Sequence, residues 1–453
     1  MSWLLAHGIG GIRNLPIPVE VFFYGAAGVL VVSFVALAGL WRRPVLAERA
    51  DGRPLPPILQ RVLDSTLLRV LVGGVSFAGL VFLWLGALIG TNSSGANLTP
   101  TVVYVYFWVG MALVVVLLGN VWAAISPWKA AAEGAGWIAR RLGLRDAPPL
   151  EYPQWLGRWP ATVMLLLFAA LELGYVNPSG PRVLALAIAI YSVLTWLGAI
   201  AFGADAWFRY GDGFSVYFGL LSRIGPLGRR DDGRLVVRTP LSGLALPDPT
   251  PGTIAFVAAM LGSTFFDGFS QTRIWQNRLY GIELDLLDQP SLYDFVITLI
   301  KVGGLVAAVA VVGSAFRLAV VGVERIGERP RLAQEFVSSL LPIALVYVIA
   351  HYFSLLLYQG EVGYRLLSDP WGRGWDLFGT RSFEPNFTFL TPHAIWYTEV
   401  AALVTGHVAG LMVAHDRAVG LFRTARLALW SQYPMLVLMV LYTVGGLWVL
   451  SQK

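Results

Sequence analysis

The chain has 453 residues, of which 56% are hydrophobic and 13% are charged, and its formal net charge is +6 at neutral pH. This composition is too apolar for a soluble protein with a polar surface, and it predicts a polytopic membrane protein. The chain has no cysteine, which excludes disulfides, thiolate metal sites and cysteine nucleophiles. We therefore predict an all-α transmembrane helical bundle that forms a single integral membrane domain over residues 1–453, surrounded by the lipid bilayer.

About ten apolar segments have roughly the 20 residues that a bilayer core requires. The fourth and the sixth are the shortest. In chain order the predicted spans are Val19–Leu40, Leu68–Gly90, Val102–Ile125, Ala161–Val176, Val183–Phe202, Thr253–Phe269, Phe295–Ala319, Gln334–Tyr358, His393–Ala414 and Tyr433–Leu450.

Basic residues are divided unevenly between the connections of these spans. Of the 33 Lys and Arg residues, 22 lie in every second connection, eight lie in the others or near the termini, and three lie in or beside spans. Because positively charged connections stay in the cytoplasm, both termini are predicted to lie outside, and residues 204–252 are predicted to form a cytoplasmic loop. The net charge then follows from topology, and nucleic acid is not expected as a partner.

Five ionisable residues lie inside predicted spans: Glu172, Asp267, Lys301, His351 and Glu399. At 1.5 Å per residue, all five fall within roughly 4 to 12 Å of the outer face. Ionisable groups are costly in hydrocarbon and usually mark a working site inside a bundle. We therefore predict that they share a polar pocket that opens toward the exterior, and we regard them as candidate catalytic residues.

Each of these residues also has a structural interpretation. Lys301 could extend its ammonium group to the outer lipid headgroups. Asp267 could pair with Arg273, which follows soon after its helix. His351 and Glu399 could each be a hydrogen-bonding group of the bundle interior.

Polar residues recur on the helix that carries His351. Tyr347, His351, Ser354 and Tyr358 follow the spacing of one helical face, so this stripe is predicted to point inward. On the next span, His407 lies beside two glycines four residues apart, a pattern that allows close helix packing. Tyr347, Ser354 and His407 are candidate substrate-binding residues, with packing as the alternative for His407.

The outer connection over residues 359–392 is rich in aromatic residues. It includes Trp371 and Trp375 among charged residues, and three phenylalanines follow. Such a segment can act as a lid whose tryptophans contact substrate, or as an aromatic anchor at the membrane interface.

Familiar catalytic motifs are absent from the sequence. It contains no HExxH motif, P-loop or calcium-binding loop, and no GxSxG nucleophile motif in a suitable context. A divalent metal could be held by His351, Asp267 and Glu399 from different helices, which is chemically allowed but has no support from spacing.

From end to end, the chain resembles a family of actinobacterial multi-pass membrane proteins commonly labelled fenitrothion hydrolase. The segments that carry the resemblance are LPIPVEVFFYGAAGVLVVSFVALAGLW near the start, ISPWKA at 125–130, GDGFSVYFGLLSRIGPL at 211–227, DGFSQT at 267–272, AHYFSLL at 350–356, SDPWGRGWDLFGT at 368–380, ALVTGHVAGLMVAHDRA at 402–418 and SQYPML at 431–436. The resemblance implies a bacterial plasma membrane protein that hydrolyses an organophosphate triester.

Three functions are compatible with the sequence. In a membrane-embedded hydrolase, a lipophilic phosphoester would enter from the outer leaflet, His351 or a bound metal would activate water, and Lys301 would stabilise negative charge. In a permease or proton-coupled carrier of a small solute, the buried acids and His351 would form a relay. The scarcity of polar residues in the inner halves of the spans argues against a carrier. In an anchoring or assembly subunit, the pocket would bind a lipid or a partner helix.

Overall fold

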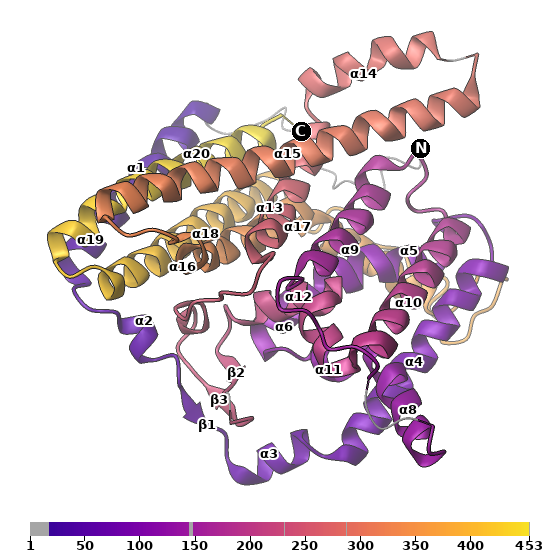
Figure 1. Cartoon of the computed structure of the whole chain (residues 1–453). Coiled ribbons are helices and arrows are strands. Elements are labelled where there is room, and N and C mark those ends of the chain that lie inside the picture. The colour runs from indigo at the N-terminus through magenta and orange to yellow at the C-terminus, as the bar shows by residue number, and fades with distance from the viewer. Residues whose placement is uncertain (1–17, 145–147, 231, 287, 453) are drawn as a thin grey trace.

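The computed structural model describes residues 18–144, 148–230, 232–286 and 288–452. Within these ranges, nine helices are long and apolar enough to cross a membrane. They lie side by side in one bundle, and a small antiparallel sheet lies apart from them (Figure 1). The fold is the predicted all-α bundle of a polytopic membrane protein.

The spans are α1 (Val19–Leu40), α4 (Thr66–Ile89), the run of α5 (Leu98–Thr101), η2 (Val102–Gly110) and α6 (Met111–Leu118), then α10 (Pro181–Phe202), α13 (Thr253–Ser270), α15 (Pro290–Gly327), the run of α16 (Ala333–Phe336), η6 (Val337–Leu340) and α17 (Leu341–Leu366), α18 (Pro392–Leu421), and the run of α19 (Ala425–Ser431) and α20 (Tyr433–Leu450). The remaining predicted span, Ala161–Val176, the fourth in chain order, is a shorter apolar helix, α9 (Trp159–Ala169), extended by η3 (Ala170–Gly174).

The first and last described helices run antiparallel. Phe22 and Ala26, near the start of α1, pack in one cluster with Leu450 at the end of α20. At the opposite end of the bundle, Phe34 of α1 contacts Tyr433, the first residue of α20. The start of α1 and the end of α20 therefore lie at the same end of the bundle. We name it the outer end, following the arginine distribution, and the opposite end the inner end.

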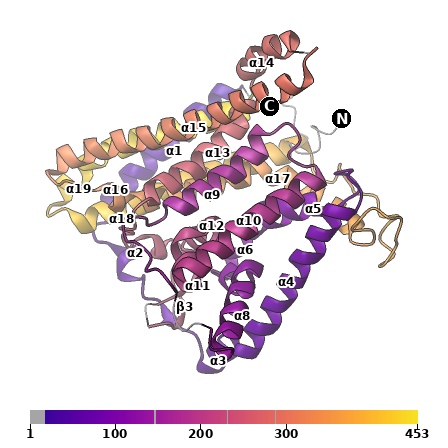
Figure 2. The same cartoon turned by 45° about the vertical axis from the view of Figure 1, so that its right-hand side comes forward.

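Helices α13 and α17 form the centre of the bundle. Buried residues make up 78% of the apolar window of α13 and 72% of that of α17, against 17% for α1 and α4. Figure 2 shows α13 and α9 between α15 on one side and α10 and α4 on the other. Close approach is possible because Gly262 of α13 faces the backbone of Val309 on α15. Polar residues in the middle of these helices, such as Asp267 and His351, are thus enclosed by protein.

The chain does not leave the bundle at the inner end of α6. Gly119, with φ +74°, ends this helix, and the short α7 (Trp122–Ile125) turns back into the interior. The chain reverses at Ser126, and α8 (Pro127–Arg141) returns toward the inner end. Trp128 reaches the middle of α10, where its Nε1 donates a hydrogen bond of 2.8 Å to Ser192 Oγ. Residues 119–141 therefore form a re-entrant hairpin, and the third predicted span was too long at its inner end.

A second hairpin of the same design follows α10. Gly203, with φ +84°, ends α10, and α11 (Ala204–Ala206) and η4 (Trp207–Gly211) turn back along it. Asp212 lies at the tip, and α12 (Gly213–Ser222) returns toward the inner end. The side chain of Asp212 contacts Thr195 of α10, which lies about 10 Å from the end of that helix.

This second hairpin corrects the prediction of a plain loop over residues 204–252. Phe214, Tyr217 and Phe218 of α12 are all buried, because α12 packs against α6 and α9 instead of facing water. The rest of the segment contains β2 (Leu227–Arg229), β3 (Leu235–Val237) and η5 (Ser242–Leu244). The strand β1 (Arg53–Pro54) pairs with β3, so the sheet order is β1-β3-β2.

The remaining helices lie at the two ends of the bundle. At the inner end these are α2 (Val45–Glu48) and α3 (Pro57–Leu63). At the outer end, α14 (Arg273–Asp285) and the first turns of α15 project beyond the other helices (Figure 1). With 38 residues, α15 is about 57 Å long, which exceeds the thickness of a bilayer core.

Candidate functional site

A cavity of about 370 Å³ opens at the outer end of the bundle. Its volume lies in the range that holds small-molecule ligands. The residues that line it come from the α4–α5 connection, α5, η2, η3, the η3–α10 connection, α13, α14, α15, α17 and the outer segment after α17. They are Ser94, Gly95, Pro100, Thr101, Tyr104, Val105, Glu172, Leu173, Tyr175, Val176, Asn177, Pro178, Ser179, Asp267, Ser270, Gln271, Trp275, Gln276, Lys301, Tyr352, Leu355, Gln359, Val362, Arg365, Pro385 and Phe387.

One face of α17 forms a wall along the length of the cavity. Tyr352, Leu355, Gln359, Val362 and Arg365 all line it, and their spacing of three or four residues is that of a single helical face. At 1.5 Å per residue this stripe is about 20 Å long. The cavity is therefore elongated, with Tyr352 at its deep end and Arg365 near its mouth.

Asp267 of α13 is the centre of a buried hydrogen-bonding group at the deep end. Its Oδ2 accepts a hydrogen bond of 2.6 Å from the Tyr352 hydroxyl. His351 Nε2 lies 2.8 Å from the same oxygen. Asp267 is 1% exposed, so protein groups replace water around its carboxyl group. Two neighbouring residues of α17 thus hold one carboxyl group of α13 in place.

Glu172 lies on the other side of Tyr352. Its Oε1 is 3.5 Å from the Tyr352 hydroxyl oxygen. A phenol has one hydrogen, and here that hydrogen is donated to Asp267. The contact with Glu172 can become a hydrogen bond at the same time only when Glu172 is protonated and donates to the phenol oxygen. The arrangement can therefore hold a proton between two carboxyl groups.

Two π-helical segments shape this part of the cavity. Tyr104 and Val105 belong to η2, whereas Glu172 and Leu173 belong to η3. A π-helical turn contains an extra residue, which changes the direction of the side chains that follow, and such turns are frequent at functional sites. The π-helical turns of η3 therefore direct Glu172 into the cavity from a helix that is otherwise apolar.

Aromatic rings close the bundle beneath the cavity. Trp108 of η2 stacks on Tyr217 of α12 with ring centroids 4.7 Å apart. Phe107 contacts both hairpins, at 5.1 Å from Trp122 and 4.6 Å from Phe214. The two re-entrant hairpins therefore fill the inner half of the bundle, and one ring of η2 contacts both of them.

The structure brings together some of the predicted site residues. Glu172, Asp267 and Lys301 all line the cavity. His351 lies behind Asp267, against a second hollow of only about 10 Å³. Glu399 is buried on α18 but is not among the described residues that line the main cavity.

The candidate substrate-binding residues lie elsewhere. Tyr347 and Ser354 are buried in α17, as the predicted stripe requires, and the Tyr347 hydroxyl donates a 2.6 Å hydrogen bond to the carbonyl of Tyr442. His407 is fully buried, with Nδ1 2.8 Å from the Leu403 carbonyl oxygen. The Tyr347 bond joins α17 to α20, whereas the His407 contact lies within α18, and none of the three side chains lines the main cavity in the described part of the chain.

The outer segment of residues 359–392 contains two different parts. Trp371 packs on Phe82, and its carbonyl accepts a 2.9 Å hydrogen bond from Thr91 N, so this part is fixed to the outer end of α4. Trp375 packs on Trp371 at 5.6 Å. Pro385 and Phe387 line the cavity instead. Only the second part is placed to cover a ligand.

Among the described residues, no group of three or more His, Asp or Glu side chains could hold a metal ion. The set of His351, Asp267 and Glu399 is therefore not brought together as a metal site. Tyr352, which the sequence analysis did not select, is the residue that joins the two acids. Its position directly after His351 was an available signal, but a lone tyrosine in a membrane helix is ordinary.

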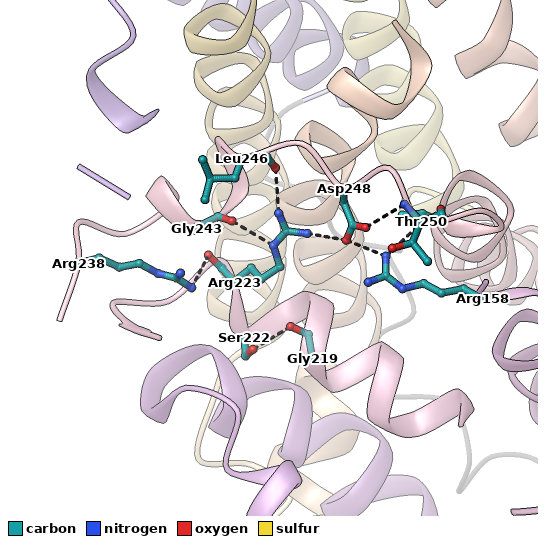
Figure 3. A network of polar contacts seen from close by, with 10 residues as sticks. Arg158, Gly219, Ser222, Arg223, Arg238, Gly243, Leu246, Asp248 and Thr250 are labelled. Carbon is teal, nitrogen blue, oxygen red and sulfur yellow. Dashed lines mark hydrogen bonds and ion pairs between the residues drawn. The ribbon is translucent and has the colours of Figure 1, made fainter. Parts of the chain in front are cut away.

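A second polar cluster lies at the inner end and connects loops (Figure 3). Asp248 Oδ2 accepts hydrogen bonds of 2.7 Å from Arg158 and 2.9 Å from Arg223. Arg223 also donates to the carbonyls of Gly243 and Leu246. Burial opposes the charge of Asp248, but the two guanidinium groups outweigh it and hold the pKa of this carboxyl group below its ordinary value. This cluster clamps the connection between α12 and α13.

Asp416 fixes another inner connection. Its carboxylate accepts hydrogen bonds from Trp41 Nε1 and from the backbone N–H groups of Leu46 and Ala47, at 2.9, 2.9 and 3.1 Å. The acid therefore holds the start of α2 against α18, and its partners are structural.

Comparison with protein-family models, with curated proteins and with solved structures found no match to this chain.

Proposed function

We propose that this integral membrane protein is a proton-coupled carrier that takes a small solute from the outer cavity. The observation that supports this function best is the position of Asp267 and Glu172. The two carboxyl groups are joined by Tyr352 at the deep end of a cavity that opens outward. Buried acids that can exchange a proton in this way are typical of transporters.

The two re-entrant hairpins supply the polar groups that the inner halves of the spans lack. The inner halves of the spans contain few polar residues, which argued against a carrier. The hairpins bring additional polar groups, among them Asp212, into the inner half of the bundle. Broken helices of this kind are common at the sites of secondary transporters. The structure then corresponds to an outward-open state in which the hairpins close the inner side.

Cysteine accessibility tests the proposal directly, because the natural chain has no cysteine. Single cysteines are introduced at Gln359, on the cavity wall, and at Gly219, between the hairpins. A Cβ at Gly219 would have only ordinary contact, 3.5 Å from Asn120. A carrier is expected to allow a membrane-impermeant thiol reagent to modify Gln359→Cys from the outside and Gly219→Cys from the inside.

Exposed Asp232, between the two inner strands, provides the control, since Asp232→Cys reports access to the inner side whatever the state of the hairpins. Protection of Gly219→Cys under all solute and pH conditions, with Asp232→Cys fully labelled, would contradict a carrier.

A hydrolase is the second candidate, and one observation favours it. Asp267 is held by Tyr352 and lies next to His351, so it is positioned as a general base facing the cavity. The resemblance to the fenitrothion hydrolase family suggests a neutral phosphotriester as substrate. In this scheme Asp267 takes a proton from water, the water oxygen forms a new P–O bond, and the P–O bond to the leaving group breaks. The leaving oxygen then receives the proton from Asp267.

The two functions predict different results. Hydrolysis requires turnover of a chromogenic phosphotriester by purified protein, with loss of turnover in Asp267→Asn and retention in Asp248→Asn, provided that the latter is assayed below its unfolding temperature. Turnover together with a permanently protected Gly219→Cys would establish the enzyme and exclude the carrier.

A further inference from the structure

A second buried aspartate resembles the outer site. Asp212 is 2% exposed and lies at the tip of the second hairpin. Its Oδ2 accepts a hydrogen bond of 2.5 Å from the Tyr191 hydroxyl and one of 3.2 Å from Thr195. At the outer site, Asp267 accepts a hydrogen bond of 2.6 Å from the Tyr352 hydroxyl group. The bundle thus contains two aspartate–tyrosine pairs at different depths.

The two pairs are separated by a thin layer of aromatic rings. Phe168 contacts Tyr104 of the cavity wall at 6.2 Å and Phe214 at 5.1 Å, and Phe214 contacts Tyr191 at 5.1 Å. Two rings, those of Phe168 and Phe214, therefore connect Tyr104 of the cavity wall to Tyr191, which binds Asp212.

Tyr217 provides a polar group inside this layer. Its hydroxyl is buried and has no hydrogen-bond partner among the described residues. Its ring stacks on that of Trp108, with ring centroids 4.7 Å apart. A buried hydroxyl group that makes no hydrogen bond destabilises the folded state. The Tyr217 hydroxyl therefore needs a transient partner, such as a proton donor or a water molecule. Tyr217 belongs to the same hairpin as Asp212.

We propose that Asp212 is the inner proton-binding residue of the carrier, which receives the proton that leaves Asp267 and Glu172 and releases it to the inner side. This inference rests on the proposed function. The titratable group bonded to Asp212 from the packed helices is Tyr191 of α10.

A glycine with a positive φ marks the start of each hairpin. Gly203 begins the second hairpin with φ +84°, as Gly119 begins the other hairpin with φ +74°. Residues with a side chain rarely adopt such angles, and glycine permits them. The tip is fixed to α10 by the side-chain hydrogen bonds of Asp212, so loss or gain of its charge changes the bonds that close the inner side.

Asp212 also has a structural role, and an experiment must separate that role from proton binding. Its Oδ1 accepts a hydrogen bond of 2.8 Å from Ser215 N and so caps the start of α12. Asparagine caps helices about as well as aspartate. Asp212→Asn therefore keeps the cap but cannot bind and release a proton. Asp205→Asn is the matched control, because Asp205 lies on the same hairpin but is exposed.

Infrared difference spectroscopy during a pH change gives the first test. We expect a carboxyl C=O stretch in the natural protein and in Asp205→Asn that is missing from Asp212→Asn. Absence of any band that Asp212→Asn removes would overturn the proposal, whatever the transport result, because the carboxyl group would then not change its protonation.

Proton movement into proteoliposomes that contain a trapped pH-sensitive dye gives the second test. After an acid pulse, the rate for Asp212→Asn is expected to fall to that of protein-free vesicles, while Asp205→Asn keeps the natural rate. If Asp267→Asn abolishes proton movement and Asp212→Asn does not, the inner site is refuted and the carrier stands. If Gly219→Cys stays protected from the thiol reagent under all conditions, the proposed carrier function itself is refuted.

Discussion

Replacement of Asp248 by asparagine removes the negative charge that two arginines share at the inner end. Arg158 and Arg223 both donate to the same carboxylate oxygen, and their side chains are 12% and 20% exposed. Breaking a buried ion pair typically costs about 3–5 kcal/mol, since the remaining charge stays without compensation. Because some solvent reaches both guanidinium groups, we expect the lower limit, about 3 kcal/mol in the free energy of unfolding.

The loss of stability in Asp248→Asn should depend on pH in a defined direction. The pKa of Asp248 is lowered in the folded protein, so this carboxylate stabilises the fold above the unfolded-state pKa of about 3.9, and the stabilisation is lost as the pH falls through the folded-state value. The difference between the natural protein and Asp248→Asn should therefore be constant between about pH 5 and 7 and should shrink below about pH 4.

Thermal and denaturant unfolding of detergent-solubilised protein, followed by tryptophan fluorescence, measures this difference. Asp232→Asn is the control, because its ion pair with Arg234 is 50% and 64% exposed and should contribute less than about 1 kcal/mol. Equal stability of Asp248→Asn and the natural protein at pH 7, or a difference that grows in acid, would refute the assignment of Asp248 as a charged clamp.

Three further substitutions test other parts of the structure. Tyr352→Phe removes the hydroxyl that joins the two acids, so proton movement or turnover should fall strongly while the unfolding temperature changes little; unchanged activity would remove Tyr352 from the site. Trp371→Ala removes the contact with Phe82, and because Trp371 is half-buried a loss of about 1–3 kcal/mol is expected in the free energy of unfolding, with faster proteolysis of the outer segment. Gly119→Ala forces a side chain into φ +74°, so unfolding should be easier by about 1–2 kcal/mol, whereas Gly134→Ala, in the open interior of α8, should be neutral or stabilising.

The spans were predictable because hydropathy and length act locally. Both ends of α1 and of α20 agree with the prediction, since α1 follows Pro18 and ends just before Arg42 and Arg43, and α20 lies between Gln432 and Ser451. α15 is longer than its predicted span, Phe295–Ala319, because polar turns outside the hydrocarbon region continue the same helix. Hydropathy marks the part of a helix inside lipid and does not mark where the helix ends.

The re-entrant hairpins could not be predicted in the same way. The segment after Phe202 contains glycine, arginine and aspartate at short intervals, which is the usual pattern of an exposed loop. Its burial depends on partners distant in sequence, such as Tyr191 for Asp212 and Trp122 for Phe218. No local pattern contains those contacts, so the inner half of the bundle was assigned too few polar groups.

The depth argument located part of the site. Glu172, Asp267 and Lys301 come from three separate helices and line one cavity, as their common distance from the outer face suggested. Depth does not determine the direction of a side chain around its helix, and His351 and Glu399 lie at a similar depth without lining the cavity. The catalytic or coupling roles of all five remain predictions.

The choice between a carrier and an enzyme depends on the inner half of the bundle. A hydrolase needs a rigid floor beneath its cavity, and apolar side chains alone would supply it at lower cost than a buried aspartate. Here the floor contains Asp212, held by two hydroxyl groups, and Tyr217, whose hydroxyl has no partner among the described residues. Such polar groups stabilise a closed state that can open when their hydrogen bonds are exchanged. A bundle that only had to stay closed would need the helix cap that Asp212 provides, but it would not need the Tyr217 hydroxyl group. The stability of a Tyr217→Phe variant, measured together with its proton movement, therefore distinguishes an inner side that opens from one that stays closed.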